Sequence, residues 1–114
     1  MDRFKIFTND PTAFPADDVR AFIDRLHANG QKVVFIVDPG VKIEPGYSTY
    51  EDLIANDLYL RDSSGQPTVG KVWAGPSVFP DWNHPNATEF WSAQIRRFLT
   101  EFPIDGEVHL SAPC

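Results

Sequence analysis

The chain has 114 residues, of which 42% are hydrophobic and 23% are charged, and its formal net charge is −6. This length allows one small domain, and the composition is that of a globular rather than a disordered protein. The negative charge argues against nucleic acid or an anionic membrane surface as a partner, because no basic run is available to neutralise phosphates.

The first predicted element is a helix over residues 16–29. It begins after a proline, with two aspartates where the helix dipole favours carboxylates. Its apolar residues recur at spacings of three and four. A strand is predicted next, over residues 32–37, because residues 33–37 are a continuous apolar run, which is typical of a parallel strand covered on both faces. Asp38 is expected at the C-terminal end of this strand, before a Pro-Gly pair.

The middle of the chain has a looser pattern. Residues 44–57 are predicted to form a loop with one helical turn, and residues 58–73 a hairpin around the segment DSSGQP. Residues 72–82, VWAGPSVFPDW, are expected to form a loop, because their glycine and prolines suit neither a helix nor a central strand. A second helix is predicted over residues 87–102 and ends before a proline; Asn86 or Thr88 is the expected cap.

The order of these elements, followed by the start of another strand, is that of a parallel α/β system. Chemistry in a (β/α) barrel gathers at the C-terminal ends of the strands, where Asp38 and the aromatic loop are expected. Asp38 is a candidate acceptor for the hydroxyls of a sugar, or alternatively a turn aspartate. Trp73, Phe79 and Trp82 are candidates for a sugar-stacking surface, or alternatively for a small core beneath the loop.

Several kinds of site are not expected. The only cysteine, Cys114, allows neither an internal disulfide nor a cysteine-based metal centre. The three histidines lack metal-ligand spacing, and no phosphate-binding or nucleotide motif is present, so no metal or other cofactor is predicted. No apolar run approaches the ~20 residues of a membrane span, and residues 1–11 contain no apolar signal core.

Four motifs occur in the same order and at similar spacing in glycoside hydrolase family 31: FTNDPTAFP, LHANGQKVVFIVDPG, GKVWAGPSVFPDWNHPNATEFW and PIDG. Residues 1–106 resemble part of the catalytic (β/α)8 domain of its α-glucosidases, and residues 107–114 form an off-pattern tail. The resemblance implies an α/β fold with two to three βα units of a TIM barrel and a hairpin excursion. It also implies a parent enzyme that releases terminal α-linked glucose, with retention, from maltose- or starch-type oligosaccharides.

The resemblance also implies roles for individual residues. Asp38 corresponds to an aspartate that binds glucose in the first subsite, and Ile36 and Trp73 correspond to walls of that subsite. Phe79 and Asp81 belong to the FPD motif that follows. Ala74 replaces a proline of the family, which implies a looser loop.

The nucleophile of the family pattern is missing from this sequence. Leu110 stands where the family has its nucleophilic aspartate, and the acid/base would lie beyond residue 114. Because retaining hydrolysis needs two carboxyl groups about 5–5.5 Å apart, the chain alone is expected to be inactive. Two alternatives stay open, a weak carbohydrate-binding remnant and a non-functional truncated product.

Asn86 begins the sequon Asn-Ala-Thr and is a possible glycosylation site if the chain enters the secretory pathway. Members of the family are often secreted, vacuolar or in the secretory pathway. The sequence itself does not assign a compartment.

Overall fold

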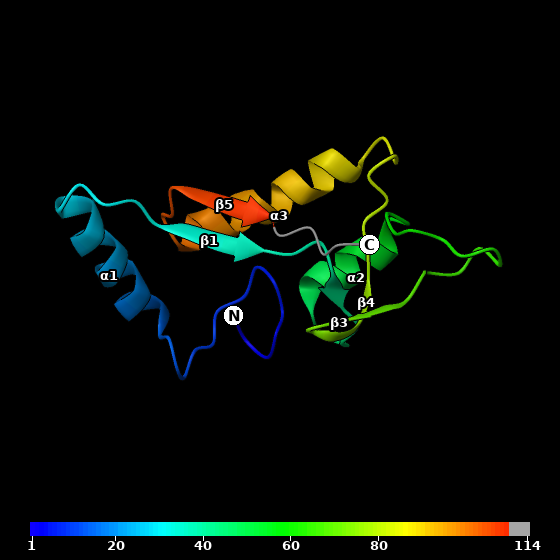
Figure 1. Cartoon of the computed structure of the whole chain (residues 1–114), viewed down its shortest axis with the longest axis horizontal. Coiled ribbons are helices and arrows are strands. Elements are labelled where there is room, and N and C mark those ends of the chain that lie inside the picture. The colour runs from blue at the N-terminus through cyan, green and yellow to red at the C-terminus, as the bar shows by residue number, and fades with distance from the viewer. Residues whose placement is uncertain (110–114) are drawn as a thin grey trace.

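A computed structural model describes the backbone of residues 1–109 and the surroundings of side chains up to Glu107. The chain is elongated, with extents of 52 × 28 × 27 Å. Two separate small sheets lie along its length, with helices beside them (Figure 1). Leu110, the position that corresponds to the family's nucleophile, lies outside the described residues.

The first sheet is parallel and has two strands, β1 (Val34–Val37) and β5 (Gly106–His109). They pair in register from Val34 opposite Gly106 to Val37 opposite His109. Two helices accompany the sheet, α1 (Ala16–Ala28) and α3 (Ala87–Glu101). The predicted strand and both predicted helices are therefore present, with bounds within two residues of those expected.

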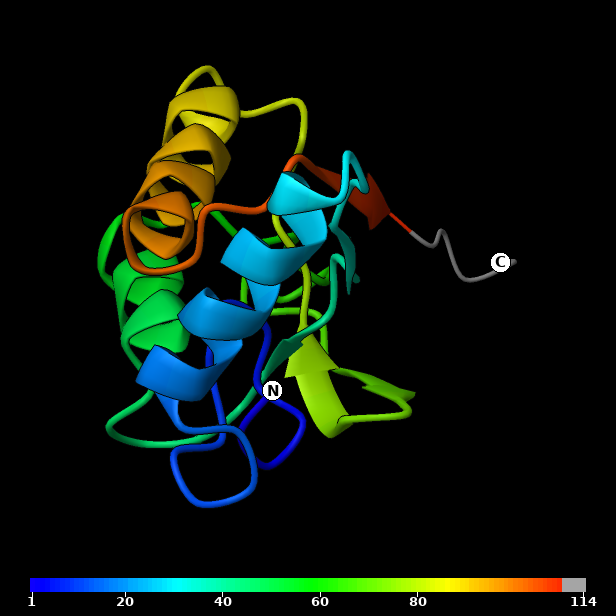
Figure 2. The ribbon, with the colours of Figure 1, turned by 90° about the vertical axis from the view of Figure 1, so that its left-hand side faces the viewer.

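One face of β1 is buried and the other is open. Ile23 of α1 and Phe98 of α3 form a core with Val33, and Phe35 packs against it. Figure 2 shows α1 and α3 together on this side of the strand. On the other face, Val34 and Ile36 are 51% and 55% exposed.

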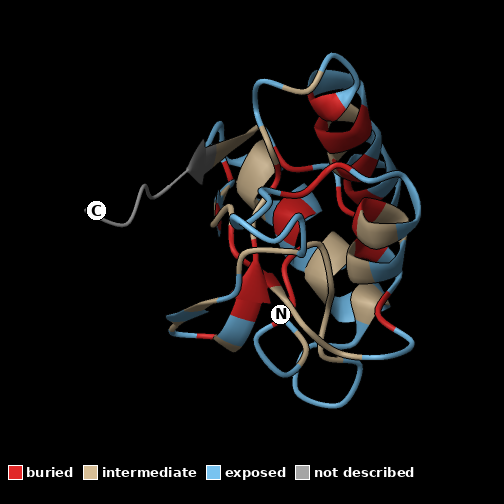
Figure 3. Cartoon of the chain, turned by 90° about the vertical axis from the view of Figure 1, so that its right-hand side faces the viewer, coloured by how far each residue is buried: buried red, intermediate tan, exposed pale blue. Residues whose placement is uncertain are grey.

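The expectation that both faces of this strand are covered was therefore wrong. Side chains of a strand alternate between two faces, and a face is buried only if a layer of structure covers it. The helices supply one such layer among the described residues. Figure 3 shows buried segments gathered where the helices meet the sheets, with exposed segments around them.

The second sheet is antiparallel, with strand order β2-β4-β3. Its strands are β2 (Val41–Lys42), β3 (Gly70–Val72) and β4 (Gly75–Val78).

β4 lies inside the segment that was expected to be a loop, so the exclusion of a central strand there was wrong. Pro76 is tolerated because β2 ends at Lys42, before the ladder reaches the position opposite the proline. The Pro76 carbonyl still accepts a hydrogen bond from the Ile43 N–H, at 3.0 Å.

The segment between the sheets is more ordered than its pattern predicted. Residues expected to form one helical turn form the eight-residue helix α2 (Ser48–Ala55), whose Thr49 and Leu53 are fully buried. The hairpin predicted over residues 58–73 is reduced to a turn with one bridge, Arg61 to Pro67. The longer hairpin is formed by β3 and β4, because residues 70–72 pair with the strand that follows them.

Candidate sugar-binding site

The side chains of Asp38 and Trp73 meet at one end of the parallel sheet. Asp38 follows β1 directly, and Trp73 lies in the turn between β3 and β4. The indole Nε1–H of Trp73 donates a hydrogen bond to Asp38 Oδ2. The structure thus joins the two sheets through two residues that lie 35 positions apart in the sequence.

The β3–β4 hairpin determines where the indole projects. Val72 pairs with Gly75, so Trp73 and Ala74 are the turn residues between the strands. Gly75 has a φ of +96°, a conformation that L side chains rarely adopt, and its lack of a Cβ lets the chain reverse here. Ala74 is buried with 6% of its surface exposed, whereas Trp73 is 49% exposed. The indole therefore projects from a turn whose other residue is buried, and part of its surface is open to solvent.

Ile36 lies on the open face of β1, two residues before Asp38. It lines an apolar cavity of about 380 Å³ between the N-terminal segment, α1 and β1. Phe14 and Phe22 line the same cavity, but Asp38 and Trp73 do not. Ile36 thus lies two residues from Asp38 along the chain but lines a cavity that Asp38 and Trp73 do not line.

Phe79 packs on the second sheet rather than against Trp73. A Cβ added to Gly70 would lie 2.8 Å from Phe79 Cε2, and one added to Gly40 would lie 3.5 Å from Phe79 Cε1. The ring therefore occupies space that two glycines leave free. This is one reason why the segment is aromatic.

Asp81 organises the turn that leads into α3. Its Oδ1 accepts a hydrogen bond from the Asn83 N–H at 3.0 Å, as in an Asx-turn, and its own N–H donates to the Leu58 carbonyl at 2.8 Å. Trp82, next to it, makes an edge-to-face contact with Trp91 of α3, with 5.2 Å between ring centroids. The three aromatic residues proposed as one stacking surface thus have three different surroundings.

Asp105 lies at the opposite end of the parallel sheet from Asp38, just before β5. Its carboxylate accepts hydrogen bonds from the Val33 N–H at 2.8 Å, Lys32 Nζ at 2.9 Å and His27 Nε2 at 2.7 Å. The bond from Val33, with those from Lys32 and His27, holds the pKa of Asp105 well below its usual range. Asp105 thereby links α1, β1 and the start of β5, which is a structural role.

The part of the chain that the structure describes contains neither a metal-binding cluster nor a membrane-spanning helix. No group of three or more His, Cys, Asp or Glu side chains there could hold a metal ion. None of its helices combines the length and the apolar character needed to cross a bilayer. Asn86, the sequon asparagine, is exposed at the start of α3 and makes no side-chain capping hydrogen bond.

Comparison with known proteins identifies the family. The sequence model described as "Glycosyl hydrolases family 31 TIM-barrel domain" matches residues 1–108. A probable alpha-glucosidase of Oryza sativa subsp. japonica is 45% identical over 106 residues, which cover 93% of this chain and 12% of that protein. Alpha-xylosidase 1 of Arabidopsis thaliana is 38% identical over 106 residues, with the same shares covered.

A solved structure agrees with these matches. The family 31 alpha-glucosidase of Bacteroides thetaiotaomicron aligns with a TM-score of 0.81 and 32% identity, over 94% of this chain and 18% of that one. The chain thus spans only a small part of the proteins it matches. The predicted family and the predicted partial-barrel fold are both confirmed. This chain belongs to glycoside hydrolase family 31, and it forms part of that family's TIM-barrel domain.

Proposed function

We propose that the chain is part of a retaining α-glucosidase that releases terminal glucose from maltose- or starch-type oligosaccharides. In this proposal Asp38 and Trp73 form one wall of the glucose pocket. The hydrogen bond from Trp73 Nε1 to Asp38, at the C-terminal end of β1, carries the proposal. The alpha-glucosidase names of the relatives support it.

The chemistry of the pair suits a sugar. Trp73 engages one carboxylate oxygen, Oδ2, which fixes the orientation of the carboxylate and leaves Oδ1 to accept hydrogen bonds from a ligand's hydroxyls. The part-exposed indole offers an apolar surface to the C–H groups of a pyranose ring. A carboxylate beside an aromatic plane therefore matches a ligand with both hydroxyls and an apolar face.

Asp38 is proposed to bind the substrate and not to act as the nucleophile. A retaining glycosidase places two carboxyl groups about 5–5.5 Å apart, one as nucleophile and one as acid/base. The resemblance assigns the nucleophile position to Leu110, whose side chain has no nucleophilic oxygen. The 114-residue polypeptide is therefore proposed to bind a sugar weakly without hydrolysing it.

A second candidate substrate is an α-xyloside. The 38% identity to Alpha-xylosidase 1 favours it, since that similarity extends over 93% of the chain. Xylose lacks the exocyclic CH₂OH group of glucose. A pocket that prefers xylose would fill the space of that group.

The proposal can be tested by titrating the ¹⁵N-labelled chain with methyl α-D-glucopyranoside and following its amide and indole resonances. A charge-assisted hydrogen bond contributes ~1.5–3 kcal/mol, whereas association costs at least ~4 kcal/mol, so millimolar or weaker affinity is expected. The resonances of Asp38 and Trp73 should shift, and Asp38→Asn should weaken binding by about tenfold or more.

Asp24→Asn is the matched control, because Asp24 is exposed on α1 and its loss should leave the affinity unchanged. If Asp38→Asn binds the glucoside as well as the unmodified chain does, the proposed pocket is wrong. Larger shifts with methyl α-D-xylopyranoside would favour the second candidate.

A further inference from the structure

The N-terminal segment places an aromatic ring against Trp73. The ring of Phe4 makes an edge-to-face contact with the indole of Trp73, with 5.7 Å between centroids and 86° between planes. Phe4 is 58% exposed, so the contact lies at the surface, beside the hydrogen bond from Trp73 to Asp38. Three residues from three separate segments thus form one row, Phe4, Trp73 and Asp38.

The backbone at Phe4 adopts an unusual conformation. Arg3 and Phe4 have φ angles of +42° and +64°, in the left-handed region that residues with a Cβ seldom occupy. Two such residues in succession turn the Phe4 ring outward, while the next residues, Lys5 and Ile6, are buried. Conformations of this kind persist where the surroundings impose them.

Ionic contacts anchor this turn to the end of β2. Lys42 Nζ donates a hydrogen bond to the Arg3 carbonyl at 2.9 Å. Lys5 Nζ lies 2.7 Å from Asp2 Oδ2 and 3.3 Å from Glu44 Oε1. Lys5 is 8% exposed, so its ion pairs are more shielded from water than ordinary surface pairs are. The Arg3 carbonyl before Phe4 and the Lys5 ammonium group after it are thus tied to the end of β2, in the sheet that carries Trp73.

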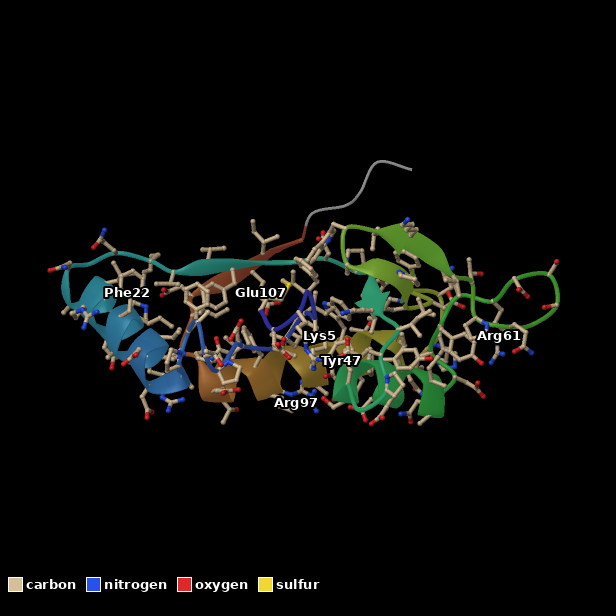
Figure 4. All side chains as sticks on the ribbon, turned by 90° about the horizontal axis from the view of Figure 1, so that it is seen from below. Lys5, Phe22, Tyr47, Arg61, Arg97 and Glu107 are labelled. Atoms are coloured by element: carbon tan, nitrogen blue, oxygen red, sulfur yellow. The ribbon has the colours of Figure 1, made fainter. Side chains whose placement is uncertain are left out.

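A neighbouring tyrosine also holds the N-terminal segment. Tyr47 is buried, and its hydroxyl donates to the Ile6 carbonyl at 2.8 Å. Lys5 Nζ lies 5.9 Å from the centre of the Tyr47 ring, and Figure 4 shows the two side chains together in the middle of the molecule. Residues before and after Phe4 in the chain are therefore both held by contacts with distant residues.

We propose that Phe4 is a positioning residue of the sugar site: its edge-to-face contact sets the orientation of the Trp73 indole, so that Nε1–H stays directed at Asp38. The ligand class is the α-glycopyranoside of the proposed function, on which this inference rests. Without the ring of Phe4, an indole that is half exposed can rotate about its side-chain torsions. The hydrogen bond to Asp38 is then occupied for less of the time, and the carboxylate is less well oriented.

The indole ¹H–¹⁵N resonance of Trp73, assigned with Trp73→Phe, tests this inference directly. Phe4→Leu should shift that resonance and speed its exchange with water severalfold, and it should weaken binding of methyl α-D-glucopyranoside about two- to tenfold. Phe4→Tyr keeps the ring and should restore both properties. Phe14→Leu is the matched control, because Phe14 is 59% exposed and lines the apolar cavity beside α1, which Trp73 does not line.

Each outcome has a distinct meaning. An unchanged Trp73 resonance and unchanged affinity in Phe4→Leu would overturn the inference while leaving the proposed function intact. If the unmodified chain binds no glycoside but the resonance moves with Leu and returns with Tyr, the proposed function fails and the positioning of Trp73 by Phe4 stands. Unchanged indole resonances of Trp82 and Trp91 report correct folding, and Phe4→Met replaces Phe4→Leu if the latter fails to fold.

Discussion

The Asp38 carboxylate and the Trp73 indole depend on each other at the scale of single residues. An aspartate beside a proline is free to form a local turn, but here its Oδ2 is engaged by a residue from another sheet. That contact distinguishes Asp38 from Asp81, whose carboxylate accepts from the N–H two residues further along the chain. The same residue type therefore has a local role at one position and a long-range role at the other.

Replacing Trp73 by Phe separates the two contributions of the tryptophan. The variant keeps an aromatic ring but loses the Nε1–H donor, so the Asp38 carboxylate is less well oriented. A half-exposed hydrogen bond contributes about 1 kcal/mol, and the affinity for methyl α-D-glucopyranoside should fall about fivefold. The same NMR titration measures it. Trp82→Phe is the control and should change nothing; equal affinity in both variants would show that the donor is unimportant.

At the scale of elements, the ring of Phe79, which directly follows β4, packs into space that two glycines leave free. These are Gly70 of β3 and Gly40, just before β2. Gly70→Ala places a methyl group where the Phe79 ring lies, at 2.8 Å. The ring must move, and overpacking of this kind costs ~1–3 kcal/mol of unfolding free energy.

Gly106→Ala is the matched control. It is also a strand glycine, but an added Cβ there meets no atom within 4 Å, so little change is expected. Urea unfolding of both variants measures the difference. Equal midpoints would mean that Phe79 does not occupy the space above Gly70.

The carboxylate of Asp105 links three elements and gives the fold a pH dependence. Its pKa is lowered in the folded chain relative to ~3.9 when unfolded. The stability that it contributes is therefore fully present above about pH 4 and is lost as the pH falls through the folded pKa. Asp105→Asn should lower the melting temperature at pH 7, because the amide replaces one acceptor oxygen by a donor.

Thermal unfolding between pH 7 and pH 2.5 tests this expectation. The difference between the unmodified chain and Asp105→Asn should be largest at pH 7 and should shrink below about pH 4. Asp24→Asn, on the exposed side of α1, should show no such pattern. A difference that stays constant at low pH would assign the effect to packing instead of ionisation.

At the scale of the whole molecule, the chain should bind a sugar without turning it over. Release of p-nitrophenol from its α-glucoside is the measurement, and no release above the uncatalysed rate is expected from the 114-residue polypeptide. The physical reason is that the covalent step needs a carboxylate nucleophile and a second carboxyl group to protonate the leaving oxygen. Release above the uncatalysed rate from the pure chain would contradict this prediction and show that another carboxylate serves as the nucleophile.

Local patterns were enough to predict part of this fold. The two helices and the strand before Asp38 follow from periodicity and from residues at their ends, which act within a few positions of one another. The family motifs added the expectation that Asp38 and Trp73 share a site. These features depend on neighbouring residues or on long motifs, so the sequence by itself determined them.

Only the tertiary structure decided the rest. The apolar run of residues 33–37 predicts a strand, but whether Val34 and Ile36 are covered depends on which layers pack on it. A glycine- and proline-rich segment forms the central strand β4 because β2 ends at Lys42, before the position opposite Pro76, while β3 pairs along the other edge of β4. Phe4 belongs to no periodic pattern, and its ring reaches Trp73 through left-handed backbone angles and ion pairs to distant residues. Such contacts are set by the packing of segments far apart in the chain, which local propensities do not encode.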